Sequence, residues 1–151
     1  METTIISYLA ARPSRDLLIR AHQEATHRWW RTRRKDFRVF VSPFVIDECR
    51  GGDATVARRR LQLLRRVPLL AISDSVRHVA EVLLDREAVP RVAEVDSLHI
   101  ALAAVHGMDY LLTWNCKHIA NATKRLEIEE ICREQGFEPP VICTPDETLE
   151  G

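Results

Sequence analysis

The chain has no long apolar run, no segment of low complexity and no net charge. No stretch approaches the roughly 18 consecutive apolar residues that a membrane-spanning helix needs, so we expect a protein that does not enter a membrane. The amino terminus has no basic segment followed by an extended apolar core, which argues against a signal peptide and predicts a cytoplasmic location. Because 46% of the residues are hydrophobic, the composition excludes a disordered or fibrous protein.

The cysteines form no closely spaced pair of the CxxC type. All four lie in mostly apolar segments, so we expect reduced thiols in the core of the protein. Cys116 and His118 are near each other, but no second pair in the sequence would complete a tetrahedral zinc site. The four positions are Cys49, Cys116, Cys132 and Cys143.

The net charge of zero hides an uneven distribution. Residues 1–66 carry 15 Lys and Arg against 7 Asp and Glu, a difference of +8, whereas residues 67–151 carry 7 against 15, a difference of −8. A basic flank of this kind can attract a polyanion such as RNA, although a solvated helix surface is the simpler interpretation. Trp29 and Trp30 can stack on bases, or they can anchor a core or a dimer contact. The candidate phosphate-binding residues are Arg31, Arg33, Arg58 and Arg59.

Short apolar runs alternate with amphipathic segments along the chain. Helices are expected from Pro13-Ser14 (with Leu18, Ala21, Ala25 and Trp29 on one stripe), from Ser42-Pro43, from Asp53, over the apolar stripe of residues 76–84, around Asp96 and over residues 125–131. Strands are expected at residues 37–41, 69–72, 110–112 and 141–143. This alternation predicts a single α/β domain over residues 1–151, with a short, mostly parallel sheet covered by helices on both faces.

Four polar side chains lie near the expected ends of these elements. In a parallel sheet the ligand site forms at the carboxyl ends of the strands, where Glu2, Glu48, Asp96 and Asn115 can converge. Clustered carboxylates repel one another unless a cation compensates. A set of oxygen ligands favours Mg²⁺ or Mn²⁺ over zinc or copper.

Four segments of the chain together resemble a known family. They are Glu2-Thr-Thr-Ile-Ile-Ser-Tyr-Leu, the helix end Ile46-Asp-Glu-Cys49, Asp96-Ser-Leu-His-Ile-Ala101 and Leu112-Thr-Trp-Asn-Cys-Lys-His-Ile119. In order and spacing they are similar to the PIN-domain pattern, and in particular to the VapC-like toxins of bacterial toxin–antitoxin systems. The resemblance implies a three-layer α/β/α sandwich. It also implies an endoribonuclease that depends on Mg²⁺ or Mn²⁺, acts as a homodimer and is paired with an antitoxin protein.

The resemblance also assigns roles to individual residues. Glu2, Glu48 and Asp96 stand at the family's metal-binding acids, and Asn115 falls in the segment where many members carry a Thr-x-Asn or Thr-x-Asp motif. The chain departs from the pattern at His118, where many relatives have a further Asp, and at Glu2, where the family has Asp. Only Met1 precedes Glu2, so we expect either that the given chain starts late or that the first strand is truncated.

Each of these residues also has a purely structural interpretation. Asp96 in the first turn of a helix is favourable by the helix dipole alone, at about 0.3–1 kcal/mol. Asn115 can cap a turn, Thr113 can bind a carboxylate or only end its strand, and His99 is expected to be a hydrogen-bonded core residue rather than a catalytic base. The alternative function is a PIN fold that has lost catalysis through its shortened amino terminus and binds RNA or a protein partner without cutting.

Overall fold

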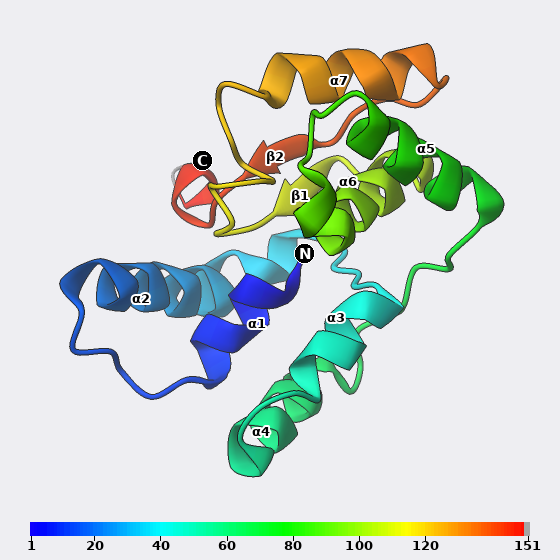
Figure 1. Ribbon diagram of the computed structural model, residues 1–151. Helices are drawn as coiled ribbons and strands as arrows, with labels where there is room; N and C mark the ends of the chain where they lie inside the picture. The colour runs from blue at the N-terminus through cyan, green and yellow to red at the C-terminus, as the bar shows by residue number, and fades with distance from the viewer. Residues whose placement is uncertain (150–151) are drawn as a thin grey trace.

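The structure, a computed structural model, describes residues 1–149. Helices dominate these residues, and the strands are short (Figure 1). The α-helices are α1 (Thr3–Ala10), α2 (Leu17–Thr32), α3 (Pro43–Cys49), α4 (Ala54–Leu64), α5 (Asp74–Asp85), α6 (Glu94–Val105) and α7 (Arg125–Glu134). The strands are β1 (Tyr110–Leu112) and β2 (Val141–Cys143), and single 3-10 turns lie at Arg34–Asp36, Arg91–Ala93 and Asp146–Thr148.

The two strands form a parallel pair connected through α7. Tyr110 is opposite Val141 and Leu112 is opposite Cys143. Both strands are buried at their second and third residues, as expected for a parallel sheet that helices cover. The predicted α/β class and the parallel pairing are therefore confirmed, with a sheet of two strands in the described part of the chain.

The predicted strands at residues 37–41 and 69–72 are wrong, because neither segment forms a regular strand. They meet only in a single parallel bridge between Val41 and Leu69. Val41 N donates to Pro68 O over 3.1 Å, and Leu70 N donates to Val41 O over 2.9 Å. Two strands alone are marginally stable, and the segment before Val41 has no complete strand on its other side. Its residues are extended, but they form no continuous ladder.

The first two residues lie between the two paired regions. The Met1 ammonium donates to Phe40 O over 2.9 Å, and Glu2 N donates to Leu112 O over 3.1 Å. Met1 and Glu2 therefore occupy the end of a strand position between β1 and the 38–41 segment.

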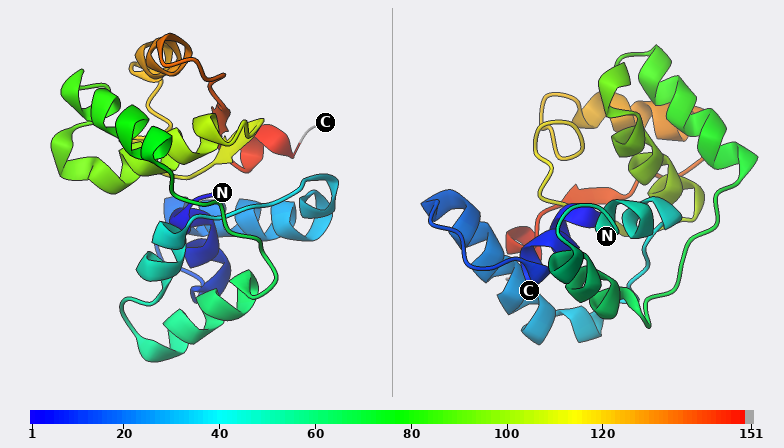
Figure 2. Two further views of the ribbon diagram at one scale, coloured as in Figure 1. Left: turned by 90° about the vertical axis from the view of Figure 1, so that its right-hand side faces the viewer. Right: turned by 60° about the horizontal axis from the view of Figure 1, so that its bottom comes forward.

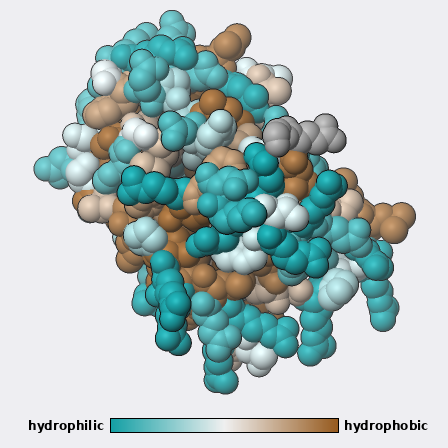
Figure 3. Space-filling view, turned by 180° about the vertical axis from the view of Figure 1, so that it is seen from behind, coloured by the Kyte–Doolittle hydropathy of each residue, from teal (hydrophilic) through white to brown (hydrophobic). Residues whose placement is uncertain are grey.

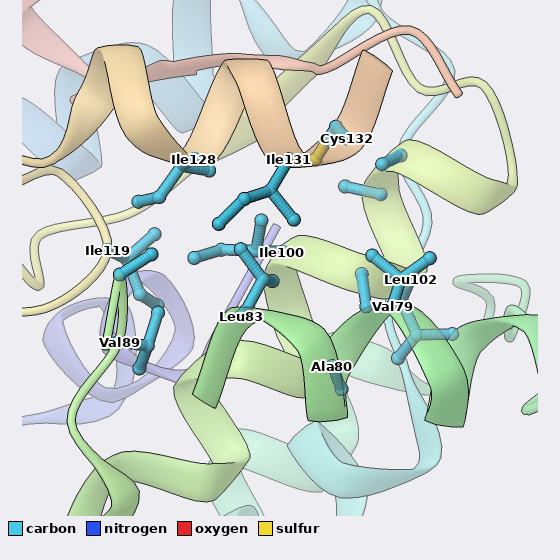
Figure 4. Packing of buried hydrophobic residues seen from close by; sticks show 14 of the residues in the cluster. Val79, Ala80, Leu83, Val89, Ile100, Leu102, Ile119, Ile128, Ile131 and Cys132 are labelled. Atoms are coloured by element: carbon cyan, nitrogen blue, oxygen red, sulfur yellow. The ribbon is translucent and has the colours of Figure 1, made fainter. Parts of the chain in front are cut away.

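Three separate clusters of buried side chains make up the core. The largest belongs to α5, α6, α7 and β1. Figure 4 shows Ile128 and Ile131 of α7 pointing toward Leu83 and Ile100. A second cluster lies among α1, α3 and α4, and it includes Val41 just before α3 and Val67 just after α4. A third cluster, which includes Ile5 of α1, joins helices α1 and α2 to the two strands. Figure 2 shows the two halves, α5–α7 with the sheet and α1–α4, in two further orientations.

The helix predicted from Pro13-Ser14 begins later, at Leu17, with the Asp16 side chain accepting from Ile19 N as the cap. Its predicted apolar stripe is partly wrong, because Leu18 is 66% exposed. Trp29 is buried as predicted, but the other buried residues of this helix are Gln23 and Thr26. Polar side chains are tolerated there because they find hydrogen-bond partners. The spacing of apolar and polar residues in the sequence does not show that such partners exist.

The cysteine prediction holds at three of its four positions. Cys49, Cys132 and Cys143 are buried free thiols, whereas Cys116 is exposed. Burial raises the pKa of each buried thiol to about 11, so these thiols stay protonated and unreactive at neutral pH. Cys116 is exposed because it lies in the loop after β1 rather than in a buried element. Over residues 1–149, no helix is both long enough and apolar enough to cross a bilayer.

Candidate functional site

Asp96 lies in the first turn of α6 and is paired with a histidine. The Nδ1 atom of His118 is 2.8 Å from Asp96 Oδ2, and each side chain is 19% exposed. An ionised carboxylate can only accept, so the imidazole donates this hydrogen bond. His118 stands where the resemblance implied a further acid, and the described geometry makes it the direct partner of Asp96.

Asn115 organises the loop that carries His118. Its side-chain Oδ1 accepts from His118 N over 3.1 Å. Its carbonyl oxygen accepts from Ile119 N over 3.1 Å and from Ala120 N over 2.8 Å. These bonds form a side-chain-capped turn directly after β1. Asn115 therefore fixes the backbone position from which His118 reaches Asp96.

Glu48, in the last turn of α3, is the most accessible of the predicted acids. Its side chain is 42% exposed, and its Oε2 atom lies 3.4 Å from His99 Nε2. The Thr3 hydroxyl donates to the same oxygen. The hydrogen bond from His99 lowers the pKa of Glu48, and the Thr3 hydroxyl adds to this effect against the opposing effect of burial. Glu48 is therefore held as a carboxylate at an open surface.

Glu2 is buried and serves as the cap of α1. It is 3% exposed, and its Oε2 accepts from Thr4 N over 3.1 Å. Its Oε1 accepts from the Thr113 hydroxyl over 2.7 Å and from the Thr4 hydroxyl. A carboxylate at this position satisfies a free N–H of the first helical turn. Glu2 thus ties the start of α1 to the end of β1.

A network of contacts connects the predicted residues. Glu48 contacts His99 on α6, and His99 lies three residues after Asp96, on the same side of that helix. Asp96 contacts His118, which Asn115 positions. Asn115 N in turn donates to the Thr113 hydroxyl over 2.9 Å. The same hydroxyl donates to Glu2, so hydrogen bonds connect Glu2, Asn115 and Asp96. The Glu48–His99 pair adjoins them only through helix α6.

Sequence reasoning did not foresee Thr3, Thr4 and His118 as partners of the acids. The partners of Glu48 and Asp96 are 45 and 22 residues away in the sequence, and no local spacing marks such pairs. The one available signal was the short Thr-rich segment after Glu2. Thr113 was left open between binding a carboxylate and ending its strand, and it does both.

The acids have the chemistry for a hard divalent cation but are not gathered around a common point. Within residues 1–149, no group of three or more His, Cys, Asp or Glu side chains is placed to hold a metal ion. Glu2 is already occupied by three hydrogen bonds. Glu48 and Asp96 are partly exposed and are the carboxylates best able to reach a cation from solvent. A three-carboxylate metal site would therefore need side-chain rearrangement.

The predicted phosphate-binding arginines are divided between two helices. Arg58 and Arg59 are exposed on α4, and Arg31 is exposed near the end of α2. Arg33 follows α2 and lies 3.5 Å from Asp36. Both helices pack against α1. Figure 3 shows long hydrophilic side chains projecting along the lower edge of the back of the molecule.

Comparison with known proteins gave no match: no protein-family model, no curated protein and no solved structure was similar to this chain.

Proposed function

We propose that the protein is a Mg²⁺- or Mn²⁺-dependent endoribonuclease of the PIN type, with Asp96 and Glu48 as its principal metal-binding acids. The observation that carries this proposal is that Asp96 and Asn115 both bind His118 in the loop after β1, while Glu48 contacts His99 three residues further along the same helix as Asp96. Parallel-sheet proteins place their ligand sites at this end of the strands. The three-layer sandwich, the homodimer and the antitoxin that the resemblance implies remain predictions.

The roles of the residues follow from their surroundings. A bound divalent ion would lower the pKa of a water molecule and offset the negative charge that develops on the phosphate. Glu48 is accessible and held ionised by His99, so it can bind a cation without first losing a proton. His118 orients the Asp96 carboxylate, as hydrogen-bonded partners commonly do for metal-binding carboxylates. Glu2 supports the site indirectly by fixing α1 against Thr113.

A second candidate function is a module that binds RNA or a protein partner without cleavage. One observation favours it, namely the lack of a three-residue metal group over residues 1–149. The close pairing of Asp96 with His118 points in the same direction, because an imidazole that holds the carboxylate competes with a cation for it.

The test compares the wild type with Asp96→Asn in two assays, with and without Mn²⁺. If Asp96 binds the ion, Mn²⁺ at a hundredfold excess over its Kd stabilises the wild type by about 2.7 kcal/mol. Asp96→Asn keeps the shape of the side chain and can still accept a hydrogen bond from His118. We expect it to remove most of the Mn²⁺ response and to abolish cleavage of a single-stranded RNA.

Asp85→Asn is the matched control. Asp85 is an exposed acid at the end of α5 whose side chain pairs with Arg91, and exposed pairs of this kind contribute roughly 0–1 kcal/mol. This variant should cut RNA and respond to Mn²⁺ as the wild type does. If the wild type neither cuts RNA nor responds to Mn²⁺, the nuclease proposal is wrong and the binding module replaces it. Equal cutting by Asp96→Asn would move the site elsewhere.

A further inference from the structure

The two acids of the proposed metal site are each held at only one of their two carboxylate oxygens. Asp96 Oδ2 accepts the hydrogen bond from His118 Nδ1 over 2.8 Å. On Glu48, the Oε2 atom lies 3.4 Å from His99 Nε2 and also accepts from the Thr3 hydroxyl. Within the described part of the chain, no hydrogen bond or ion pair reaches Asp96 Oδ1 or Glu48 Oε1. Each acid therefore has one engaged oxygen and one open oxygen.

The contact between His118 and Asp96 is fixed from both sides by the largest core cluster. On the loop side, His118 N donates to Asn115 Oδ1, and the next residue, Ile119, is only 1% exposed. On the helix side, Asp96 lies four residues before Ile100, which is fully buried in the same cluster. Figure 4 shows Ile119 and Ile100 in this cluster. Because both backbones are anchored, His118 releases Asp96 by rotating its own side chain rather than by moving the loop.

An engaged oxygen restricts how a carboxylate binds a cation. A bidentate carboxylate turns both oxygens to the ion, but Asp96 Oδ2 already accepts the His118 N–H. Both side chains are only 19% exposed, so a donor that loses this acceptor is not freely compensated by water. Asp96 is therefore arranged to offer the single oxygen Oδ1. In the same way Glu48 offers Oε1, because His99 and Thr3 hold its other oxygen.

Divalent cations differ in the carboxylate oxygens that they need. Ca²⁺ takes about 6–8 oxygen ligands and readily accepts both oxygens of a carboxylate. Mg²⁺ requires a near-octahedral shell, keeps several waters and binds through one or two carboxylates, and Mn²⁺ suits the same carboxylate and water ligands. Acids that each offer one oxygen match Mg²⁺ or Mn²⁺, whereas they leave the larger shell of Ca²⁺ short of protein ligands.

We propose that His118 sets the cation specificity of this site. Its hydrogen bond holds Asp96 to binding through one oxygen, which favours Mg²⁺ or Mn²⁺ over Ca²⁺. The proposal rests on the metal-dependent function proposed above and adds the residue that determines the choice of cation. His118 is a positioning residue, because it acts through Asp96 and does not touch the ion. What matters is an N–H donor beside Asp96 Oδ2, not the imidazole as such.

The test measures the affinity of the full chain for Mn²⁺ and for Ca²⁺ by titration calorimetry. The paramagnetic resonance signal of free Mn²⁺, with Ca²⁺ as competitor, gives a second readout that needs no activity. In the wild type we expect Ca²⁺ to bind at least about tenfold more weakly than Mn²⁺. His118→Ala removes the N–H and frees Oδ2. It should weaken Mn²⁺ binding by roughly tenfold or more but Ca²⁺ binding much less, so the ratio of the two affinities should fall.

Two further variants separate the N–H donor from other effects. His118→Asn places an amide N–H near the position of Nδ1, so the ratio of affinities should stay close to that of the wild type. His78→Ala is the matched control, because His78 is exposed on α5 and contacts Gln135 over 3.0 Å. This variant should bind both cations as the wild type does.

Three results would overturn the proposal. If Mn²⁺ still binds and the ratio is the same in the wild type and His118→Ala, His118 does not select the cation, although the metal site stands. If His118→Asn loses Mn²⁺ as completely as His118→Ala does, His118 is itself a ligand of the ion. If the wild type binds neither Mn²⁺ nor Ca²⁺, the proposed metal-dependent function is wrong, and the role of His118 falls with it.

Discussion

The hydroxyl of Thr26 is predicted to stabilise the loop that carries the candidate site. Thr26 is fully buried in α2. Its Oγ1 accepts from Trp114 Nε1 over 2.7 Å and donates to His22 O over 2.6 Å. The Trp114 ring also stacks on His22, with centroids 4.0 Å apart. These contacts hold α2 against the residue between Thr113 and Asn115.

The substitution Thr26→Val keeps the shape of the side chain and removes only the hydroxyl. The indole N–H of Trp114 then loses its acceptor in a buried site, which costs about 1–3 kcal/mol. A chain of this length shifts its melting temperature by roughly 2–4 °C per kcal/mol. We therefore expect a decrease of about 4–8 °C for a cost of about 2 kcal/mol.

Thermal unfolding followed by circular dichroism measures this effect, and Thr32→Val is the matched control. Thr32 is in the same helix, and its hydroxyl makes the same type of bond, to Arg28 O over 2.8 Å, but at an exposed position. Its loss should change stability by less than about 0.5 kcal/mol. Adding Trp114→Phe to Thr26→Val should cost less than the two single changes together. A Thr26→Val protein that melts within 1 °C of the wild type would refute the reasoning.

Three further predictions concern other parts of the chain. Arg58→Gln and Arg59→Gln should each flatten the dependence of log K on log salt for single-stranded RNA by roughly 0.7 if the side chain contacts a phosphate; an unchanged slope would mean that they are solvated surface. Burial lowers the pKa of the Met1 ammonium from 8.0 to about 6. Between these two pH values the amine of the unfolded chain still holds a proton that the amine of the folded chain has lost. The free energy of unfolding should then rise by up to about 3 kcal/mol as the pH goes from about 6 to 8, and acetylating Met1 should remove this rise in denaturant titrations. Gly136 has a φ of +85° after α7, so Gly136→Ala should lower stability by about 1–2 kcal/mol, whereas Gly51→Ala, whose added methyl group meets only an ordinary contact at 3.4 Å, should change it little.

Local signals in the sequence predicted the elements whose stability is decided locally. Ser42 caps α3, with Pro43 in its first turn, and Asp53 caps α4, both as predicted. The apolar stripe over residues 76–84 is buried as expected. The strands at residues 110–112 and 141–143 pair in parallel. These features depend on capping, helical periodicity and short apolar runs, which neighbouring residues encode.

Features that depend on distant partners could not be predicted. The buried side chains of Gln23 and Thr26 break the expected apolar stripe of α2. They are tolerated because Gln23 binds Arg12 O and Ser14 N, while Thr26 binds Trp114, 88 residues away. In the same way, the positions of Asp96 and Asn115 near the end of β1 followed from the order of the elements. The pairing of Asp96 with His118 depends on the loop between them and has no signature in the sequence.

The candidate site adjoins a groove of about 690 Å³ that β1, the 37–42 segment and α6 line, and the two share a boundary at the first two residues. Met1 ends the groove, and Glu2 holds the Thr113 hydroxyl at the edge of the site. His99 lines the groove and also lies 3.4 Å from Glu48. Met1 and His99 therefore join the wall of this groove to the surroundings of the two acids Glu2 and Glu48.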